Sequence, residues 1–185
     1  MTGAKPVFVD VGLDFNLDPE KIEAAITAST KAIVPMHVAG LMCDMDKICQ
    51  IARRKKLLVI EDAAQAFCST LGGRRAGSFS IAAAFSMNPM KILHGYGEAG
   101  AIVTNNRKIY EKILQLRHAG TSTKSGSHDI NRCNFISLNH KIDTIQSSFL
   151  LEEMDRIHEI KKKRDEIAEY YDKQIPSLGC QTQPI

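Results

Sequence analysis

The feature that most constrains the fold of this chain is an alternation of apolar runs and amphipathic helical segments in its first half. Residues 31–36, apolar after Lys31, and the apolar run 57–60 are of strand length, and the second ends at Glu61 and Asp62. Between them, Asp44 precedes a segment whose apolar residues recur at helical spacing. Continuous apolar strands separated by amphipathic helices are typical of a parallel sheet covered on both faces. The pattern therefore predicts an α/β fold.

The same reasoning predicts the other elements of the chain. The expected strands are 7–11, 31–36, 57–60, 81–85 and 101–104. The expected helices begin at Pro19 after the cap Asp18, after the cap Asp44, and at about Asn106, the last running to Leu116. We expect a turn at residues 72–75 and a polar loop at 120–134. From Ile142 onward the chain is expected to be helical, in two segments that meet near residues 156–159.

Composition argues against several classes of protein. A net charge of +3 is too small for a nucleic-acid-binding face, and the basic cluster 161–164 lies beside acidic residues in a helical pattern, as on a solvated helix face. No apolar run approaches the roughly 20 residues of a membrane span, and residues 1–6 do not resemble a signal peptide. The five cysteines contain no C-x-x-C pair, which favours reduced thiols in a cytoplasmic protein and no metal site.

Three polar segments follow predicted strands, where open α/β sheets bind their ligands. They are His37, Asp62 to Gln65, and Ser86 to Lys91. Singly they prove little, because an aspartate in such a place often caps a helix and a loop lysine is usually solvated. Together they suit a pyridine aldehyde, which needs a lysine amine for a Schiff base and a carboxylate that keeps its ring nitrogen protonated. Lys91 and Asp62 could supply these groups, Gln65 could reach the phenolic oxygen, and Ser86 the phosphate.

The stretch from Gly95 to Gly100 matches the G-x-G-x-x-G pattern of dinucleotide-binding sites. In those sites the glycines follow a strand and open a helix. Here they lead into the predicted strand 101–104, so the context is reversed. We therefore interpret these glycines as sites of close backbone approach to the lysine loop.

Several segments resemble the DegT/DnrJ/EryC1/StrS aminotransferases. They are Ile-Glu-Asp-Ala-Ala-Gln-Ala at 60–66, Phe-Ser-Met-Asn-Pro-Met-Lys at 85–91, Gly-Glu-Ala-Gly-Ala-Ile-Val-Thr at 97–104, and further matches at 6–10, 30–37, 116–118 and 164–171. Their order and spacing agree with the family over nearly the whole chain. The chain departs from the family where Ser80-Ile81 replaces Gly-Asp and Ala99 replaces a frequent glycine. Family members are also roughly twice as long.

The resemblance implies the type I, aspartate-aminotransferase-like fold. Residues 1–140 would form the central part of the cofactor-binding large domain, a mostly parallel sheet flanked by helices. Residues 141–185 would form a helical segment that leads toward the small domain.

The resemblance also implies the cofactor pyridoxal 5'-phosphate and the residues that hold it. Lys91 is then the catalytic, Schiff-base lysine, Asp62 the partner of the pyridine nitrogen, Gln65 the contact of the ring oxygen, and Ser86 a contact of the phosphate. Asn139 stands where a family asparagine reaches the cofactor phosphate of the neighbouring subunit. A homodimer is therefore expected for the full-length protein.

The function that the resemblance implies is transfer of an amino group, commonly from glutamate, to a nucleotide-linked keto-sugar, as in polysaccharide biosynthesis. Three alternatives stay open. The first is a sugar dehydratase of the same family, which Lys91 disfavours because those relatives carry histidine there. The second is a non-catalytic remnant, or a chain that binds a full-length partner, because the chain is short for its family. The third is a cofactor-free scaffold in which Lys91 and Asp62 form an ion pair.

Overall fold

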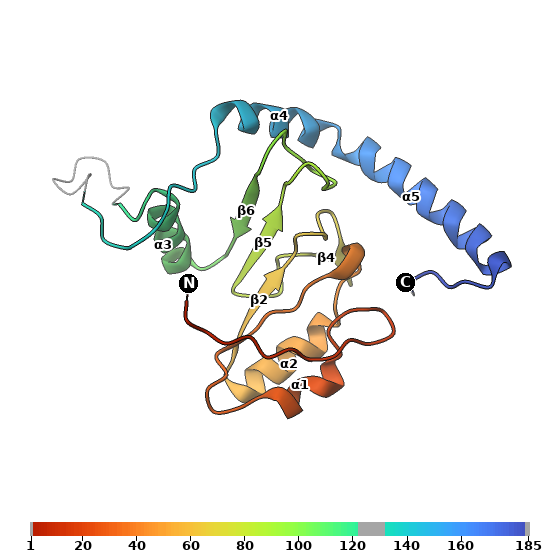
Figure 1. Cartoon of the computed structure of the whole chain (residues 1–185), viewed down its shortest axis with the longest axis horizontal. Helices are drawn as coiled ribbons and strands as arrows, with labels where there is room; N and C mark the ends of the chain where they lie inside the picture. Colours follow the sequence, from red (N-terminus) through yellow and green to blue (C-terminus); the bar gives the residue numbers. More distant parts are fainter. Residues whose placement is uncertain (1, 122–131, 184–185) are drawn as a thin grey trace.

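The computed structural model describes residues 2–121 and 132–183 and contains a four-stranded sheet with helices on its flanks (Figure 1). The strand order is β1-β2-β5-β6. These strands are β1 (Ala32–Ile33), β2 (Leu58–Asp62), β5 (Ala82–Ser86) and β6 (Gly100–Val103). The first three are parallel and β6 is antiparallel to β5, so the sheet is mostly parallel, as predicted. A separate hairpin of β3 (Thr70–Leu71) and β4 (Arg74–Arg75) contains the predicted turn.

Five α-helices and two short 3-10 helices are found among the described residues. They are α1 (Pro19–Ala25), η1 (Val38–Gly40), α2 (Met45–Lys55), α3 (Arg107–Arg117), α4 (Thr144–Asp155), α5 (Ile157–Gln174) and η2 (Ile175–Leu178). The predicted caps Asp18 and Asp44 are confirmed, since each accepts a backbone N–H of the first helical turn, and the structure adds Asn106 as the cap of α3. The predicted break in the C-terminal helical region falls at Arg156.

The main core lies between one face of the sheet and the helices α1 and α2, which lie side by side below β2 in Figure 1. Met45 and Ile48 of α2 are fully buried there. They belong to the same cluster as Ile22 of α1, Ile33 of β1 and Val59 of β2. The helical spacing of the apolar residues in α2 therefore reports the face that packs on the sheet.

The opposite face of the sheet carries exposed apolar side chains. Leu58 and Ile60 are 50% and 37% exposed, whereas Val59 between them is buried. Ile102 on β6 is 56% exposed. The sequence predicts a sheet covered on both faces, but the described helices bury only the face that contacts α1 and α2.

The predicted strand at 7–11 is wrong. Val11 forms a single antiparallel bridge to Leu17, and the segment joins neither sheet. Phe8 is 90% exposed and Val7 66%. A β-branched run becomes a strand only where a second strand pairs with it, and the described residues supply none here.

A smaller apolar cluster joins the C-terminal helices to the loop that follows β5. Leu93 of that loop, Leu150 of α4 and Ile157 of α5 are its buried members. The glycine-rich segment ends in β6 and opens no helix, so the dinucleotide reading is excluded. A Cβ on Gly100 would lie 2.9 Å from the backbone oxygen of Phe85, which explains this glycine by close backbone approach.

The predicted polar loop at 120–134 lies largely outside the described residues. Across residues 2–121 and 132–183, no helix combines the length and apolar character needed to cross a membrane. All five cysteines are free thiols.

Candidate active site

Asp62 and Ser86 are at the carboxyl ends of neighbouring parallel strands and share one face of the sheet. Asp62 of β2 pairs in register with Ala84 of β5. Residues in register lie on the same face, and so do residues two apart on one strand, so Asp62, Ala84 and Ser86 face the same way. This is the face opposite the α1–α2 core.

Lys91 lies on a tight loop that begins at Ser86. Asn88 organises this loop: its carbonyl accepts the Lys91 N–H at 2.9 Å, and its Oδ1 accepts the Met90 N–H at 3.0 Å. The Asn88 side-chain amide donates to Glu98 Oε1 at 2.9 Å, which ties the loop to the segment entering β6. The position of the Lys91 backbone is therefore set by several hydrogen bonds from one asparagine.

A cavity of about 590 Å³ opens beside this loop. Its lining includes three of the predicted site residues, Gln65, Ser86 and Lys91. The other residues that line it are Ala39, Ala64, Phe67, Asn88, Met90, Ile92, Glu98 and Arg164. No described residue lies within ion-pairing or hydrogen-bonding distance of Lys91 Nζ, so the amine is available to a ligand.

The orientation of the Gln65 amide follows from its contact with η1. Gln65 Oε1 accepts the backbone N–H of Ala39 at 2.7 Å. Because an N–H can only donate, the oxygen is assigned to this contact, and the NH₂ group is left as the donor for a ligand. Ala39 itself has a positive φ of 54°, which is a strained conformation for alanine and brings its N–H to this place.

Asp62 is half-buried at the end of β2 and is not among the residues that line the cavity. Its Oδ1 accepts the N–H of Ala64, two residues on, at 3.1 Å. The sheet face on which Asp62 lies and its position at a strand end agree with its predicted role as partner of the pyridine nitrogen. The scaffold reading needs an ion pair between Asp62 and Lys91, and none is present among the described residues.

His37 and Glu61 form a buried pair on the core side of the sheet, away from the cavity. His37 Nε2 lies 3.1 Å from Glu61 Oε2, and both side chains are fully buried. His37 Nδ1 accepts the Cys43 N–H at 3.2 Å, so the ring hydrogen is on Nε2 and donates to Glu61. The His37 side chain is therefore a structural group rather than part of the site.

Glu61 accepts three further hydrogen bonds, from the N–H groups of Gly77 and Phe79 and from the Ser80 hydroxyl, at 2.7, 3.0 and 2.7 Å. Burial alone would raise the pKa of Glu61, but the bonds from His37, Ser80 and the two backbone amides outweigh it and lower that pKa to about 2. The carboxylate is thus ionised inside the core and anchors the turn before β5.

Asn139 lies apart from the cavity. It forms an isolated antiparallel bridge with His118, just after α3, and its side chain is exposed. The structure therefore does not bring Asn139 to the cavity of its own chain, and its predicted role toward a neighbouring subunit stays a prediction.

Sequence reasoning missed three polar residues of the cavity: Asn88, Glu98 and Arg164. Asn88 and Glu98 lie inside recognised segments, but their mutual hydrogen bond spans ten residues and has no local signature. Arg164 belongs to a basic cluster that the pattern assigns to a solvated helix face. That prediction is confirmed, because residues 161–164 are all exposed and Lys161 and Lys162 pair with Asp165 and Glu166 along α5. Arg164 lines the cavity in addition.

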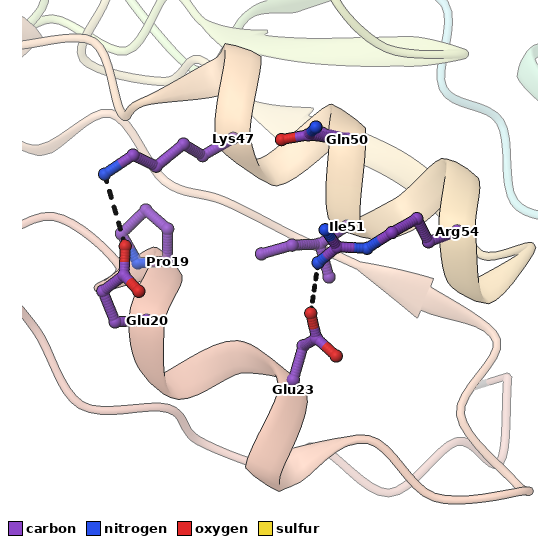
Figure 2. Close-up of a pocket in the computed structure, with 7 residues that line it drawn as sticks. All are labelled: Pro19, Glu20, Glu23, Lys47, Gln50, Ile51 and Arg54. Atoms are coloured by element: carbon purple, nitrogen blue, oxygen red, sulfur yellow. Dashed lines mark hydrogen bonds and ion pairs between the residues drawn. The ribbon is translucent and has the colours of Figure 1, made fainter.

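A second hollow, of about 320 Å³, lies between α1 and α2 (Figure 2). Its charged side chains pair across it: Lys47 contacts Glu20 at 3.3 Å, and Arg54 contacts Glu23. Every charged side chain that lines this hollow has an ionic partner, whereas Lys91 in the first cavity has none among the described residues. Within the two described ranges, no three His, Cys, Asp or Glu side chains gather in a way that could hold a metal ion.

Fold and cavity together define a class of protein. A mostly parallel sheet presents a carboxylate and a hydroxyl at its strand ends, beside a cavity with an unpaired lysine amine. Such an arrangement is typical of ligand-binding α/β domains, and a lysine amine is a group at which such domains can carry out covalent chemistry.

Comparison with known proteins identifies the family. The model of the DegT/DnrJ/EryC1/StrS aminotransferase family matches residues 1–184. The chain is 41% identical over 165 residues to a pleiotropic regulatory protein of Geobacillus stearothermophilus, covering 87% of this chain and 43% of the relative. It is 39% identical over 181 residues to GDP-perosamine synthase of Caulobacter vibrioides, covering 96% and 47%.

The structure is similar to the crystal structure of NtdA from Bacillus subtilis with bound cofactor PMP. The TM-score is 0.82 at 36% identity, over 94% of this chain and 39% of that one. The chain therefore belongs to the DegT/DnrJ/EryC1/StrS aminotransferase family, whose members use pyridoxal phosphate. It spans less than half the length of these relatives.

Proposed function

We propose that this chain is the lysine-bearing part of a pyridoxal-phosphate-dependent aminotransferase. The single observation that carries the proposal is the unpaired amine of Lys91 in a cavity that Ser86 and Gln65 also line. Asp62, on the same sheet face as Ser86, supplies the carboxylate that such a cofactor requires.

The residues present fit the cofactor in size and in chemistry. A cavity of about 590 Å³ lies within the range of roughly 300–1,000 Å³ that is usual for small-molecule sites. Its polar groups include an amine for a carbonyl carbon, a hydroxyl for a phosphate and an amide NH₂ for a phenolic oxygen. When bound, the cofactor supplies an electron sink for the carbanion formed at the substrate.

Each residue has a role that follows from its surroundings. Lys91 Nζ would hold the cofactor's carbonyl carbon and, as a free amine, would move the proton at the substrate carbon. Asp62 would keep a proton on the ring nitrogen. Gln65 would orient the ring through its NH₂ group, and Ser86 Oγ would donate to the phosphate at the strand end.

We propose a nucleotide-linked keto-sugar as the amino acceptor and an amino acid such as glutamate as the donor. The support is that relatives include GDP-perosamine synthase and a UDP-linked keto-glucuronate aminotransferase. We further propose that the full-length protein is a cytoplasmic homodimer in which Asn139 contacts the cofactor phosphate of the partner. The support for this role is that Asn139 is exposed and does not line the cavity of its own chain.

Covalent labelling tests the proposal. The chain is incubated with pyridoxal phosphate, reduced with borohydride and digested, and the labelled peptide is found by mass spectrometry. We expect one dominant phosphopyridoxyl adduct, on Lys91, and its loss in Lys91→Ala. Lys108→Ala, on exposed α3, is the matched control and should leave the labelling of Lys91 unchanged. Labelling spread evenly over surface lysines would instead support the reading of a non-catalytic remnant.

A further inference from the structure

Arg164 lines the cavity because of the way in which α5 packs. Ile157, at the start of α5, is buried in the cluster with Leu93, two residues after Lys91. Arg164 lies seven residues beyond Ile157, which is two helical turns, so both side chains leave the same face of the helix. Arg164 accordingly lines the cavity together with Lys91.

The guanidinium of Arg164 has no acidic partner among the described residues. Its neighbours Lys161 and Lys162 pair with acidic residues one turn further along α5. Glu98 is the one acidic residue that lines the cavity, and its Oε1 already accepts a hydrogen bond from Asn88. The cavity therefore holds two unpaired cations and one engaged carboxylate.

We propose that Arg164 binds an oxyanion of the substrate, a carboxylate or a phosphate, and so orients the substrate toward Lys91. This inference rests on the proposed function, because it assigns a substrate group to the same cavity. A guanidinium presents paired N–H donors in a plane, and a carboxylate or phosphate accepts them in a bidentate fashion.

Direct binding of two simple oxyanions tests the inference without a need for turnover. Succinate and inorganic phosphate are titrated separately into the chain at low ionic strength, without cofactor, by isothermal calorimetry. We expect Arg164→Gln to weaken the binding of at least one probe about tenfold or more. Arg164→Lys keeps the charge but loses the planar guanidinium. Its affinity for the probe should therefore lie between that of the wild type and that of Arg164→Gln.

Lys163→Gln is the matched control, because it removes the same charge from the adjacent, exposed position. Equal weakening in Lys163→Gln, unchanged binding in Arg164→Gln, or no binding of either probe by the wild type would overturn the inference. Circular dichroism verifies that each variant is folded. Preference for succinate identifies a carboxylate, such as that of the amino donor, and preference for phosphate identifies the nucleotide-linked substrate.

Failure of this inference is distinguishable from failure of the proposed function. In a Lys91→Ala background, which has no labelling site, Arg164→Gln should still weaken the binding of the probe about tenfold, so the two roles are measured separately. If Lys91 is not labelled while Arg164→Gln still weakens binding, the oxyanion site stands and the transaminase proposal does not.

Discussion

Glu61 and Asp62 are adjacent in sequence but act on opposite faces of the sheet, because successive side chains of a strand point in opposite directions. Glu61 enters the core and accepts hydrogen bonds from His37, Ser80 and two backbone amides. Asp62 faces the side on which Ser86 lies. The buried network therefore fixes the strand end that presents the proposed cofactor carboxylate.

Replacing Glu61 with glutamine should destabilise the fold by roughly 3–5 kcal/mol at neutral pH. The amide keeps the volume, but it has one acceptor oxygen and places an NH₂ group against donors that thereby lose their acceptor. Urea unfolding followed by circular dichroism measures the change. Glu111→Gln, on the exposed side of α3, is the control and should cost less than about 1 kcal/mol.

The same network makes a prediction about pH. The folded-state pKa of Glu61 is about 2, below the ordinary glutamate value of 4.5, so its ionised form stabilises the folded state above pH 4.5. This contribution, on the order of 3 kcal/mol, is lost as the pH falls from 4.5 toward 2. The Glu61→Gln variant should lack this part of the acid dependence. Identical slopes of stability against pH in both proteins would contradict the assignment.

At the residue scale, the sequence predicted those site residues that belong to short motifs. Gln65, Ser86 and Lys91 line one cavity, as their places after predicted strands suggest. Asp62 lies on the expected face but outside the lining. Arg164 could not be found in this way, because its arrival at the cavity depends on how α5 packs against the Lys91 loop.

The helices are the elements that the sequence predicted best, because their signals are local. Asp44 illustrates this: its Oδ1 accepts the Lys47 N–H at 3.1 Å at the start of α2. The strand at 7–11 failed for the opposite reason, since the partner that would complete a ladder cannot be read from the run itself. β1 is likewise shorter than predicted, covering Ala32–Ile33 of the run 31–36.

Removing the cap of α2 should lower stability by about 1 kcal/mol. Asp44→Ala deletes the acceptor of the Lys47 N–H, whereas Asp44→Asn retains an acceptor and should recover most of the loss. Thermal unfolding measures both. Asp46→Ala removes an acidic residue from the same first turn without removing the cap, so it serves as control. An equal loss in Asp44→Ala and Asp46→Ala would show that charge near the helix dipole, rather than capping, is responsible.

On the scale of the whole molecule, the sheet is packed on one face and bare on the other. α1 and α2 cover one face (Figure 1). Leu58, Ile60 and Ile102 expose apolar surface on the other face. α5 extends away from the sheet, and Ile157 at its start packs on the loop that follows β5. Exposed apolar area of this kind favours association in water.

The purified chain should therefore associate in a concentration-dependent manner, and Ile102→Lys should reduce this. Ile102 is 56% exposed on β6, so a charge there interrupts the apolar face without entering the core. Sedimentation velocity at several concentrations measures the effect. Asn105→Lys adds the same charge to the exposed turn after β6 without removing apolar surface, and is the control. Equal association of the wild type and Ile102→Lys would show that this face does not mediate the association.

The sequence by itself determined the α/β class, the helices with their caps, and the order of the cofactor motifs, because these depend on periodicity and short-range hydrogen bonding. Only the tertiary structure decided which faces are buried, that Asp62 and Ser86 share a face, that His37 and Glu61 belong to the core, and that Arg164 reaches the cavity. These outcomes depend on strand register and helix packing between residues distant in the chain, and such contacts leave no local pattern.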